Sequence, residues 1–398
     1  MTCHRRRYIV LLLVSSVAAL TVQAQQARSD LPPNARPISA KIDLRITASK
    51  DPAFEIIQVR DVAVDRSGNI FVLDAADQQV KMFDRSGRPV RVFGRKGPGP
   101  GEFISANVIS VLRDSLWVID RQNERVTAFS LADRGLRSFV VPGTGVGLKR
   151  VHSVTANGFL CSMPEASHFL GARGQQISYV VVNSTGAVQN SIFSGLPAPR
   201  SLVYTAAPAN NPKNWYRGFT RQPFLHPLML ATADDATSIV RVTTLKEKGR
   251  EIERVRILKV STSGDTLWRR DLSFQGRPLR PSDVQNAVDS IARSTRNIGG
   301  AVLVPNRKMI EDSILRPAVW PPVKSLVIGV DGTIWLQQGL SSTQENRYWR
   351  LSPTGTYEET VVLPAGFALQ GASRSNVWGW RTDDDGLPLI ERYRLSPR

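Results

Sequence analysis

A short pattern of apolar and polar positions recurs along this chain. Each copy consists of an apolar run, a polar turn that contains glycine, and a second apolar run, which is typical of a β-hairpin. Within the runs, apolar residues alternate with polar ones or form short uninterrupted stretches, as strands do. The turn glycines of five copies are Gly87, Gly135, Gly186, Gly264 and Gly355. The pattern predicts an all-β chain that is built from repeated hairpins.

The first two units set the length of the repeat. Val62–Asp74 and Ile109–Asp120 each contain a strand, a turn and a strand, and their closing aspartates are 46 residues apart. A third strand follows in both units, because Gln78–Phe83 matches Asn123–Phe129, and the glycine turn leads to a fourth. A propeller blade of four strands takes about 40 to 50 residues. Each unit is therefore predicted to be one blade of a β-propeller.

The units are predicted to form a ring of six blades. Four further units begin near Val151, Phe224, Val323 and Phe367. The sixth turn starts at Arg394, and its glycine would fall one residue beyond the end of the printed chain, so this unit lacks its outer strand. The alternating segment Ile38–Ile46 is predicted to supply that strand. The predicted fold is a six-bladed β-propeller over residues 38–398, closed by an N-terminal strand.

Units four and five are longer than the others, and the extra residues form two predicted insertions. The first, residues 196–222, is rich in proline, asparagine and tryptophan. The second, residues 277–322, lies between blades four and five and is predicted to be helical. A capping box at Ser282–Gln285 follows a proline, and a second short helix is expected at Asn306–Leu315. The first helix carries one apolar stripe, which consists of Val284, Val288 and Ile291.

The N-terminus has the pattern of a secretory signal. His4–Arg7 is basic, Tyr8–Val22 is uncharged and mostly apolar, and Val22-Gln23-Ala24 is a suitable cleavage site. An uncleaved anchor is the alternative, although the apolar run is short for a membrane span of about 20 residues. We therefore expect a signal peptide at residues 1–24, a polar linker at residues 25–37, and an exported protein, periplasmic or secreted, in a bacterial envelope. After cleavage the chain is not expected to span a membrane.

The charge of the chain favours anionic partners. The formal net charge is +18, and removal of three signal arginines leaves +15. Such a surface attracts polyanions, but export argues against nucleic acid, so anionic glycans or lipid headgroups are the expected counterparts. A generally basic surface without a dedicated partner is the alternative.

The mature chain keeps one cysteine, Cys161, in a strand-like run, where a buried thiol is expected.

The crossover between the first two blades resembles that of a known family. Residues 62–103 end in the Gly/Pro-rich segment Phe93–Phe103, and this arrangement resembles the six-bladed β-propellers of the NHL-repeat type. The resemblance is good over residues 56–140, fair over 323–396 and weak between them. It implies a ring used mostly for binding and scaffolding, although relatives in the wider superfamily include lactonases and a peptide-amidating lyase. The glycines are expected to make a tight turn, with Phe103 packed between blades.

One position per blade is predicted to face the mouth of the central channel. The alignment starts from the apolar pair Val62 and Val64, and it could shift by one or two residues in units three, four and six. His152 or Gln370 would then take the position in its unit. The ring is basic, which favours an anionic ligand; the alternative is that these side chains only hydrate the opening. Its predicted members are Arg60, Asn107, Arg150, His226, Lys324 and Ala368.

A metal-dependent enzyme is a weaker interpretation of the same positions. A lyase of the amidating type requires several channel histidines for zinc, and the mature chain has His152, His168 and His226, of which only His152 and His226 fall near predicted inner strands. A lactonase needs carboxylates at inner positions for a divalent cation, and most of those positions are cationic here. The sequence therefore predicts no metal and no cofactor.

The leading hypothesis is an exported binding or interaction module for an anionic ligand. The ligand is an unknown protein, an anionic glycan or a small molecule, and the protein is expected to be a monomer. Trp215 and Trp320, in the two insertions, are candidates for stacking against carbohydrate or peptide. The alternatives are a lactonase- or lyase-like enzyme with His152 and His226 near its centre, and a purely structural envelope protein.

Overall fold

The structure is a computed structural model, and most of its regular elements are strands. Apart from α1 (Pro281–Arg293), α2 (Arg307–Ser313) and a short 3-10 helix at Pro52–Phe54, the elements of the described chain are strands. The described residues are 29–30, 37–47, 51–141, 150–164, 176–197, 201–208, 211, 213, 215–225, 228–245, 252–275, 277–293, 296–298, 301–339 and 345–396. The predicted signal peptide, residues 25–28 and 31–36 of the predicted linker, His168 and His226 lie outside them.

Six four-stranded antiparallel units follow one another along the chain. The first three are β3 (Val59–Val64), β4 (Ile70–Asp74), β5 (Gln79–Phe83), β6 (Pro89–Phe93); β9 (Ala106–Leu112), β10 (Ser115–Asp120), β11 (Arg125–Ser130), β12 (Leu136–Val140); and β13 (Arg150–Thr155), β14 (Gly158–Pro164), β15 (Gln176–Val182), β16 (Val188–Pro197). The others are β19 (Met229–Thr232), β20 (Ser238–Leu245), β21 (Ile252–Ser261), β22 (Thr266–Gln275); β25 (Val323–Ile328), β26 (Ile334–Gln338), β27 (Glu345–Leu351), β28 (Tyr357–Pro364); and β29 (Ala368–Ala372), β30 (Asn376–Thr382), β31 (Pro388–Leu395) with β2 (Ile38–Ile46).

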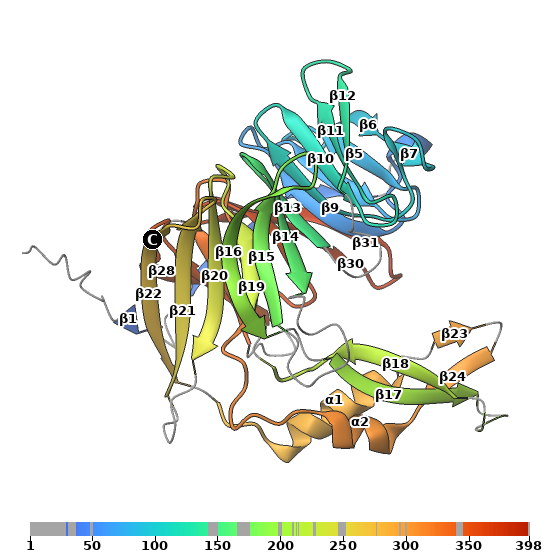
Figure 1. Ribbon diagram of the computed structural model, residues 1–398, viewed down its shortest axis with the longest axis vertical. Helices are drawn as coiled ribbons and strands as arrows, with labels where there is room; N and C mark the ends of the chain where they lie inside the picture. Colours follow the sequence, from blue (N-terminus) through green and yellow to red (C-terminus); the bar gives the residue numbers. More distant parts are fainter. Residues whose placement is uncertain are drawn as a thin grey trace, which may run out of the picture.

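The units are arranged as a ring. The innermost strands contact one another in the cyclic order β3, β9, β13, β19, β25, β29 and again β3. The apolar core lies between neighbouring units, because each sheet buries side chains on both faces. Phe71 and Leu73 of the first blade pack with Leu116 and Val118 of the second, for example. Figure 1 shows the blades side by side, coloured along the sequence. The fold is the predicted β-propeller.

Strand β2 lies between the outer strands of two blades. It pairs antiparallel with β31 from Ala40↔Leu395 to Ile46↔Ile390. Its first two residues pair in parallel with β28, at Ile38↔Val361 and Ser39↔Val362. The two-residue strand β1 (Ser29–Asp30) pairs in parallel with β22. The N-terminal segment therefore contacts the outer strands of blades four, five and six.

The Gly/Pro crossover after the first blade makes a tight turn around one aromatic ring. It contains β7 (Arg95–Lys96) and β8 (Glu102–Phe103), which pair in parallel. Phe103 is fully buried between the first two blades, as predicted. Gly94 has a φ of 74°, and a Cβ added there would lie 2.2 Å from the Phe103 ring. Glycine is needed at this position both for the left-handed backbone and for the close approach.

The two insertions form one satellite subdomain. Strands β17 (Ser201–Pro208) and β18 (Tyr216–Arg221) of the first insertion share a sheet with β23 (Arg296–Ile298) and β24 (Ala301–Pro305) of the second. Helices α1 (Pro281–Arg293) and α2 (Arg307–Ser313) pack on this sheet. The helices were predicted, whereas the shared sheet was not. Figure 1 shows the subdomain set to one side of the blades. Its core includes Leu202, Tyr204, Val284, Val288, Leu303 and Ile310.

Candidate functional site

A bulge marks one equivalent position in five of the innermost strands. Near the start of each strand the pairing with the second strand skips one residue, so that two residues face one partner. Bulges of this kind redirect a side chain and interrupt the ladder of a strand pair. The skipped residues are Arg60, Asn107, His152, Lys324 and Gln370.

The bulges place most of the sequence-predicted mouth residues. Arg60, Asn107 and Lys324 occupy the equivalent position in blades one, two and five. In blades three and six the position belongs to His152 and Gln370, two residues after Arg150 and Ala368. This is the shifted alignment that the sequence left open. His226, the predicted member from blade four, lies outside the described residues.

Three cations at this mouth are exposed. Arg60 and Lys324 sit on bulges of blades one and five, and Arg150 begins the innermost strand of blade three. In the part of the chain that the structure describes, no carboxylate forms an ion pair with any of the three. The three residues belong to blades one, three and five, which alternate around the ring.

His152 is a neutral hydrogen-bonding group at the same mouth. Its Nε2 lies 2.7 Å from the Oγ of Ser162, and its ring centre is 5.5 Å from that of Tyr179. Burial, together with the positive charge of Arg150, lowers the pKa of His152 to about 4. The imidazole is therefore uncharged at neutral pH. Within the described ranges, no three histidine, cysteine or acidic side chains are grouped to hold a metal.

A chain of buried polar side chains supports the bulge at Lys324. Ser325 donates its hydroxyl to Gln337 Oε1 at 2.9 Å, and Gln337 Nε2 donates to Asn346 Oδ1 at 3.2 Å. Asn346 Nδ2 in turn donates to the carbonyl of Phe367 at 3.0 Å. Satisfied buried networks of this kind rigidify their surroundings. Ser325, the residue after Lys324, is thus linked to the second and third strands of its own blade.

The two insertion tryptophans have different surroundings. Trp215 precedes β18 and is 55% exposed. Trp320 packs edge-on against Phe224, with ring centres 5.1 Å apart, and the guanidinium of Arg277 lies 5.2 Å from its ring centre. Its Nε1 also donates to Asp283 at 2.9 Å. Trp215 has a ring that is free for stacking, whereas the ring of Trp320 is already engaged within the satellite subdomain.

The opposite mouth of the ring holds a cavity of about 710 Å³. It lies among the turns that follow the innermost strands, and it was not predicted from the sequence. The hairpin turns resembled all other turns of the repeat, so only their convergence in space reveals the cavity. It is lined by Val64, Asp65, Arg66, Ser67, Asn69, Met82, Val111, Leu112, Arg113, Asp114, Leu131, Ala132, Asp234, Asp235 and Thr237.

An ion pair crosses the ring at this second mouth. Arg66 lies in the turn after β3 of blade one, and Asp234 lies in the turn after β19 of blade four. The Arg66 Nε donates to Asp234 Oδ2 at 2.8 Å. Blades one and four are opposite each other in a ring of six. The pair therefore bridges the mouth and forms one edge of the cavity.

Asp61 lies in the channel wall, one residue after the bulge at Arg60. Its Oδ1 accepts from the Val62 N–H at 3.0 Å, and its Oδ2 accepts from the Ile109 N–H of the neighbouring blade at 2.9 Å. Burial raises the pKa of this carboxyl to about 7, although both hydrogen bonds act in the opposite direction. Asp61 therefore titrates near neutral pH.

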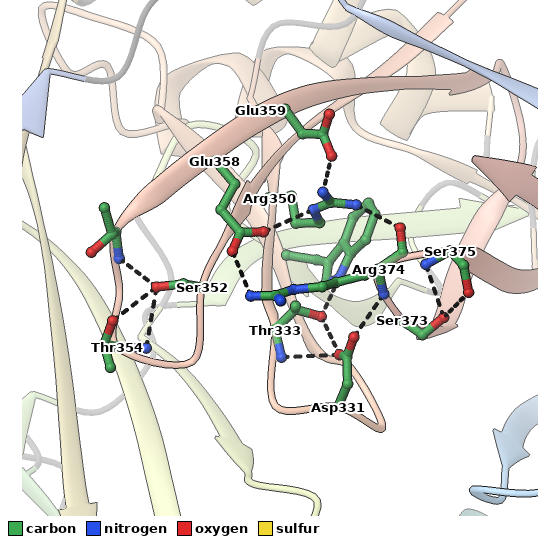
Figure 2. A network of polar contacts seen from close by, with 12 residues as sticks. Asp331, Thr333, Arg350, Ser352, Thr354, Glu358, Glu359, Ser373, Arg374 and Ser375 are labelled. Carbon is green, nitrogen blue, oxygen red and sulfur yellow. Dashed lines mark hydrogen bonds and ion pairs between the residues drawn. The ribbon is translucent and has the colours of Figure 1, made fainter. Parts of the chain in front are cut away.

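Blades five and six are joined by charged side chains (Figure 2). Glu358 accepts from Arg350 Nε at 3.1 Å and from an Arg374 guanidinium nitrogen at 2.8 Å. The backbone N–H of Arg374 donates to Asp331 at 2.7 Å, and the Thr333 hydroxyl donates to the other Asp331 oxygen at 2.6 Å. Both carboxylates, Glu358 and Asp331, have partners from the other blade, so the network stabilises a blade junction.

A family model and one solved structure agree with the fold. A family model described as a 6-bladed beta-propeller matches residues 50–138. A "Putative exported protein" from Bacteroides fragilis is similar over 93% of this chain and 99% of its own, with a TM-score of 0.51 and 12% identity. The calcium-binding protein regucalcin from Agrobacterium tumefaciens covers 91% of this chain and 98% of its own, with a TM-score of 0.39 and 12% identity. No curated protein matches the sequence.

The ring and the family model together define the class of the protein. The chain is an all-β, six-bladed β-propeller. At 12% identity, the similarity to the Bacteroides protein concerns the fold alone. No helix among the described residues is both long and apolar enough to cross a membrane.

Proposed function

We propose that this protein is an exported binding module that captures an anionic ligand at the mouth formed by the starts of its innermost strands. The observation that carries the proposal is the set of three exposed cations, Arg60, Arg150 and Lys324, which lack carboxylate partners among the described residues. Positive charges around a channel with low-dielectric walls focus the field and raise the local concentration of anions. Asn107, His152 and Gln370 supply uncharged hydrogen-bonding groups beside them.

The remaining features of the proposal follow from this role. We infer that the N-terminal signal directs export to the periplasm or beyond, and that the monomer acts without a cofactor. We also infer that β2 closes the ring by tying the last blade to its neighbour, in the manner of NHL-type propellers. Trp215, with its exposed ring, is the candidate for stacking against a sugar or an aromatic group of the ligand.

Charge reversal tests the proposal. The mature chain, beginning at Gln25, is titrated with a heparin oligosaccharide and with oligogalacturonate. The double variant Arg60→Glu/Lys324→Glu should weaken binding by about tenfold or more, and added salt should weaken the wild-type complex because the interaction is electrostatic. The control is Arg269→Glu, a single charge reversal on the exposed outer strand β22, which makes half the change of charge of the double variant.

The control decides between a specific mouth and a generally basic surface. The loss of affinity is compared for each reversed charge. If this loss is as large in Arg269→Glu as in the double variant, the basic surface acts as a whole and the proposal is wrong. If neither anion binds at low salt, the mouth does not capture anionic glycans.

A further inference from the structure

The cavity at the second mouth has the size and composition of a site for a small ligand. Its volume of about 710 Å³ lies within the range of about 300 to 1,000 Å³ that ligand pockets occupy. It is formed by turns from blades one, two and four, which are distant in the sequence. Such a convergence of rigid hairpins gives a preformed site, because each turn is anchored by its own blade.

One wall of the cavity is apolar. Val64 and Val111 come from equivalent innermost strands of blades one and two, and Met82 comes from the third strand of blade one. Leu112 and Leu131 complete this wall. Apolar surface of this kind favours a ligand with at least one aliphatic or thioether side chain, because burial against it removes that side chain from water.

Arg113 presents an unpaired cation to the same cavity. It occupies a two-residue turn between Leu112 and Ser115, and its φ of 54° lies in the left-handed region. Glycine, asparagine and aspartate are the residues favoured in such a turn, because a Cβ strains the left-handed backbone and short polar side chains offset that cost by local hydrogen bonds. The exposed guanidinium has no ion-pair partner within the described residues. Strained backbone is often found at functional sites, so the strain at Arg113 supports a role of its side chain in contacting a ligand.

Two carboxylates of the cavity, Asp114 and Asp235, form no ion pair in the described part of the chain. Asp234 is paired with Arg66, and both oxygens of Asp65 accept from Asn69. Asp114 forms no side-chain hydrogen bond in the described part of the chain. Asp235 accepts from the backbone N–H of Thr237 at 2.9 Å and from the Thr237 side chain, and Lys259 and Arg66 lie near enough to help lower its pKa.

We propose that the second mouth binds a small zwitterion with an apolar side chain, such as a short peptide with free ends. Arg113 receives the carboxylate, which matches the planar fork of a guanidinium. Asp235 and Asp114 receive the ammonium group, and the apolar wall receives the side chain. This site lies at the other end of the ring from the basic mouth, so it does not depend on the function proposed above.

Titration calorimetry with dipeptides tests the proposal on the mature full-length chain. The probes are leucyl-leucine, its N-acetylated form and its C-terminal amide, each taken to millimolar concentration. Leucyl-leucine should bind saturably, and each blocked form should bind at least about tenfold more weakly, because each lacks one of the two charges. Arg60→Glu/Lys324→Glu should leave this binding unchanged, which separates it from ligand capture at the basic mouth.

Arg113→Asn is the most informative variant. Asparagine suits the left-handed turn, so the variant should keep or raise the thermal midpoint of unfolding while it loses at least about tenfold in affinity. Arg113→Lys should retain part of the affinity, and Asp235→Asn should weaken binding of leucyl-leucine more than that of its N-acetylated form. Arg134→Asn, in an outer turn of the same blade, is the matched control.

Three results would overturn the site. The first is absence of saturable leucyl-leucine binding, the second is equal binding of the blocked forms, and the third is wild-type affinity in Arg113→Asn with the fold retained.

Discussion

At the scale of single residues, each of the first two blades has an equivalent buried aspartate that holds the segment leading into that blade. Asp74 accepts the backbone N–H groups of Ile57 and Gln58, at 2.8 and 3.1 Å. Asp120 accepts those of the two residues that lead into the second blade, at 2.7 and 3.1 Å. Both carboxylates are buried. Their repetition was visible in the sequence, but their role was not, because the partners are backbone groups that carry no sequence signal.

Asp61 makes the stability of the ring depend on pH. Burial raises its folded-state pKa from 3.8 to about 7. The folded protein therefore holds a proton that the unfolded chain releases between about pH 4 and pH 7. The stabilisation is fully present below the unfolded pKa and is lost as the pH rises through about 7. Three pK units correspond to an upper bound of about 4 kcal/mol.

Asp61→Asn should remove this dependence. Urea unfolding of the wild type should give a free energy that falls between about pH 4 and pH 7, and that of the variant should fall by less over the same interval. Asparagine keeps the size and one acceptor oxygen for the Ile109 N–H. Asp384→Asn, in an exposed turn, should retain the wild-type slope. Equal slopes in wild type and Asp61→Asn would show that the carboxyl does not bind a proton on folding in this range.

At the scale of elements, β2 ties together two blades. Ile38 is 6% exposed and packs with Val361 of β28, and also with Leu395 of β31. One side chain at the start of the strand therefore contributes to the outer parts of blades five and six. Its contacts bury apolar surface on both sides of the junction, which adds to the pairing of the backbone with β28.

Ile38→Ala should lower the free energy of unfolding by about 2 to 4 kcal/mol, because it leaves a cavity in this junction. Lys41→Ala, on the exposed side of the same strand, is the matched control and should change it by less than about 0.5 kcal/mol. Chemical denaturation measures both. A similar small effect for the two variants would mean that the start of β2 does not stabilise the junction of blades five and six.

The apolar periodicity predicted which segments of the ring are strands, but it did not predict all of their pairing partners. The segment Ile38–Ile46 was identified as a strand because it alternates, and the structure gives β2 the same bounds. Its parallel contact with β28 could not be predicted, because alternation says which face is buried and not which neighbour pairs. The shift from Arg150 to His152 has a related cause. A bulge adds one residue to a strand without altering its composition, so alignment by apolar positions alone can slip.

At the scale of the whole molecule, the two mouths differ in charge. The first carries Arg60, Arg150 and Lys324, whereas the lining of the second includes four aspartates and two arginines. The sequence pointed to Arg60 and Lys324 because both fall at the same place in their repeats, and in blade three that place belongs to His152. It did not predict the cavity, which depends on the length and convergence of turns from three blades. The ring therefore offers two separate surfaces, with anions favoured at one and mixed charge at the other.

The satellite subdomain depends on a contact between the two insertions. Gln222, at the end of the first insertion, is buried. Its Nε2 donates to the carbonyl of Ser313 at 2.9 Å, and its Oε1 accepts from the Leu315 N–H at 3.0 Å. One amide side chain thus satisfies two backbone groups of the second insertion. The subdomain also has an apolar core of its own, so we expect it to open as a unit without the blades.

Gln222→Ala tests whether the satellite subdomain opens independently of the blades. The variant leaves two backbone groups without partners, which costs about 1 to 3 kcal/mol for each group that stays buried. Hydrogen exchange should accelerate in α1 and α2, while amides in β3, β4 and β5 keep their wild-type protection. Gln285→Ala, on the exposed side of α1, should leave both regions unchanged. Faster exchange throughout the blades would show instead that the satellite subdomain and the ring unfold as one cooperative body, because a local opening cannot lower protection at a distance.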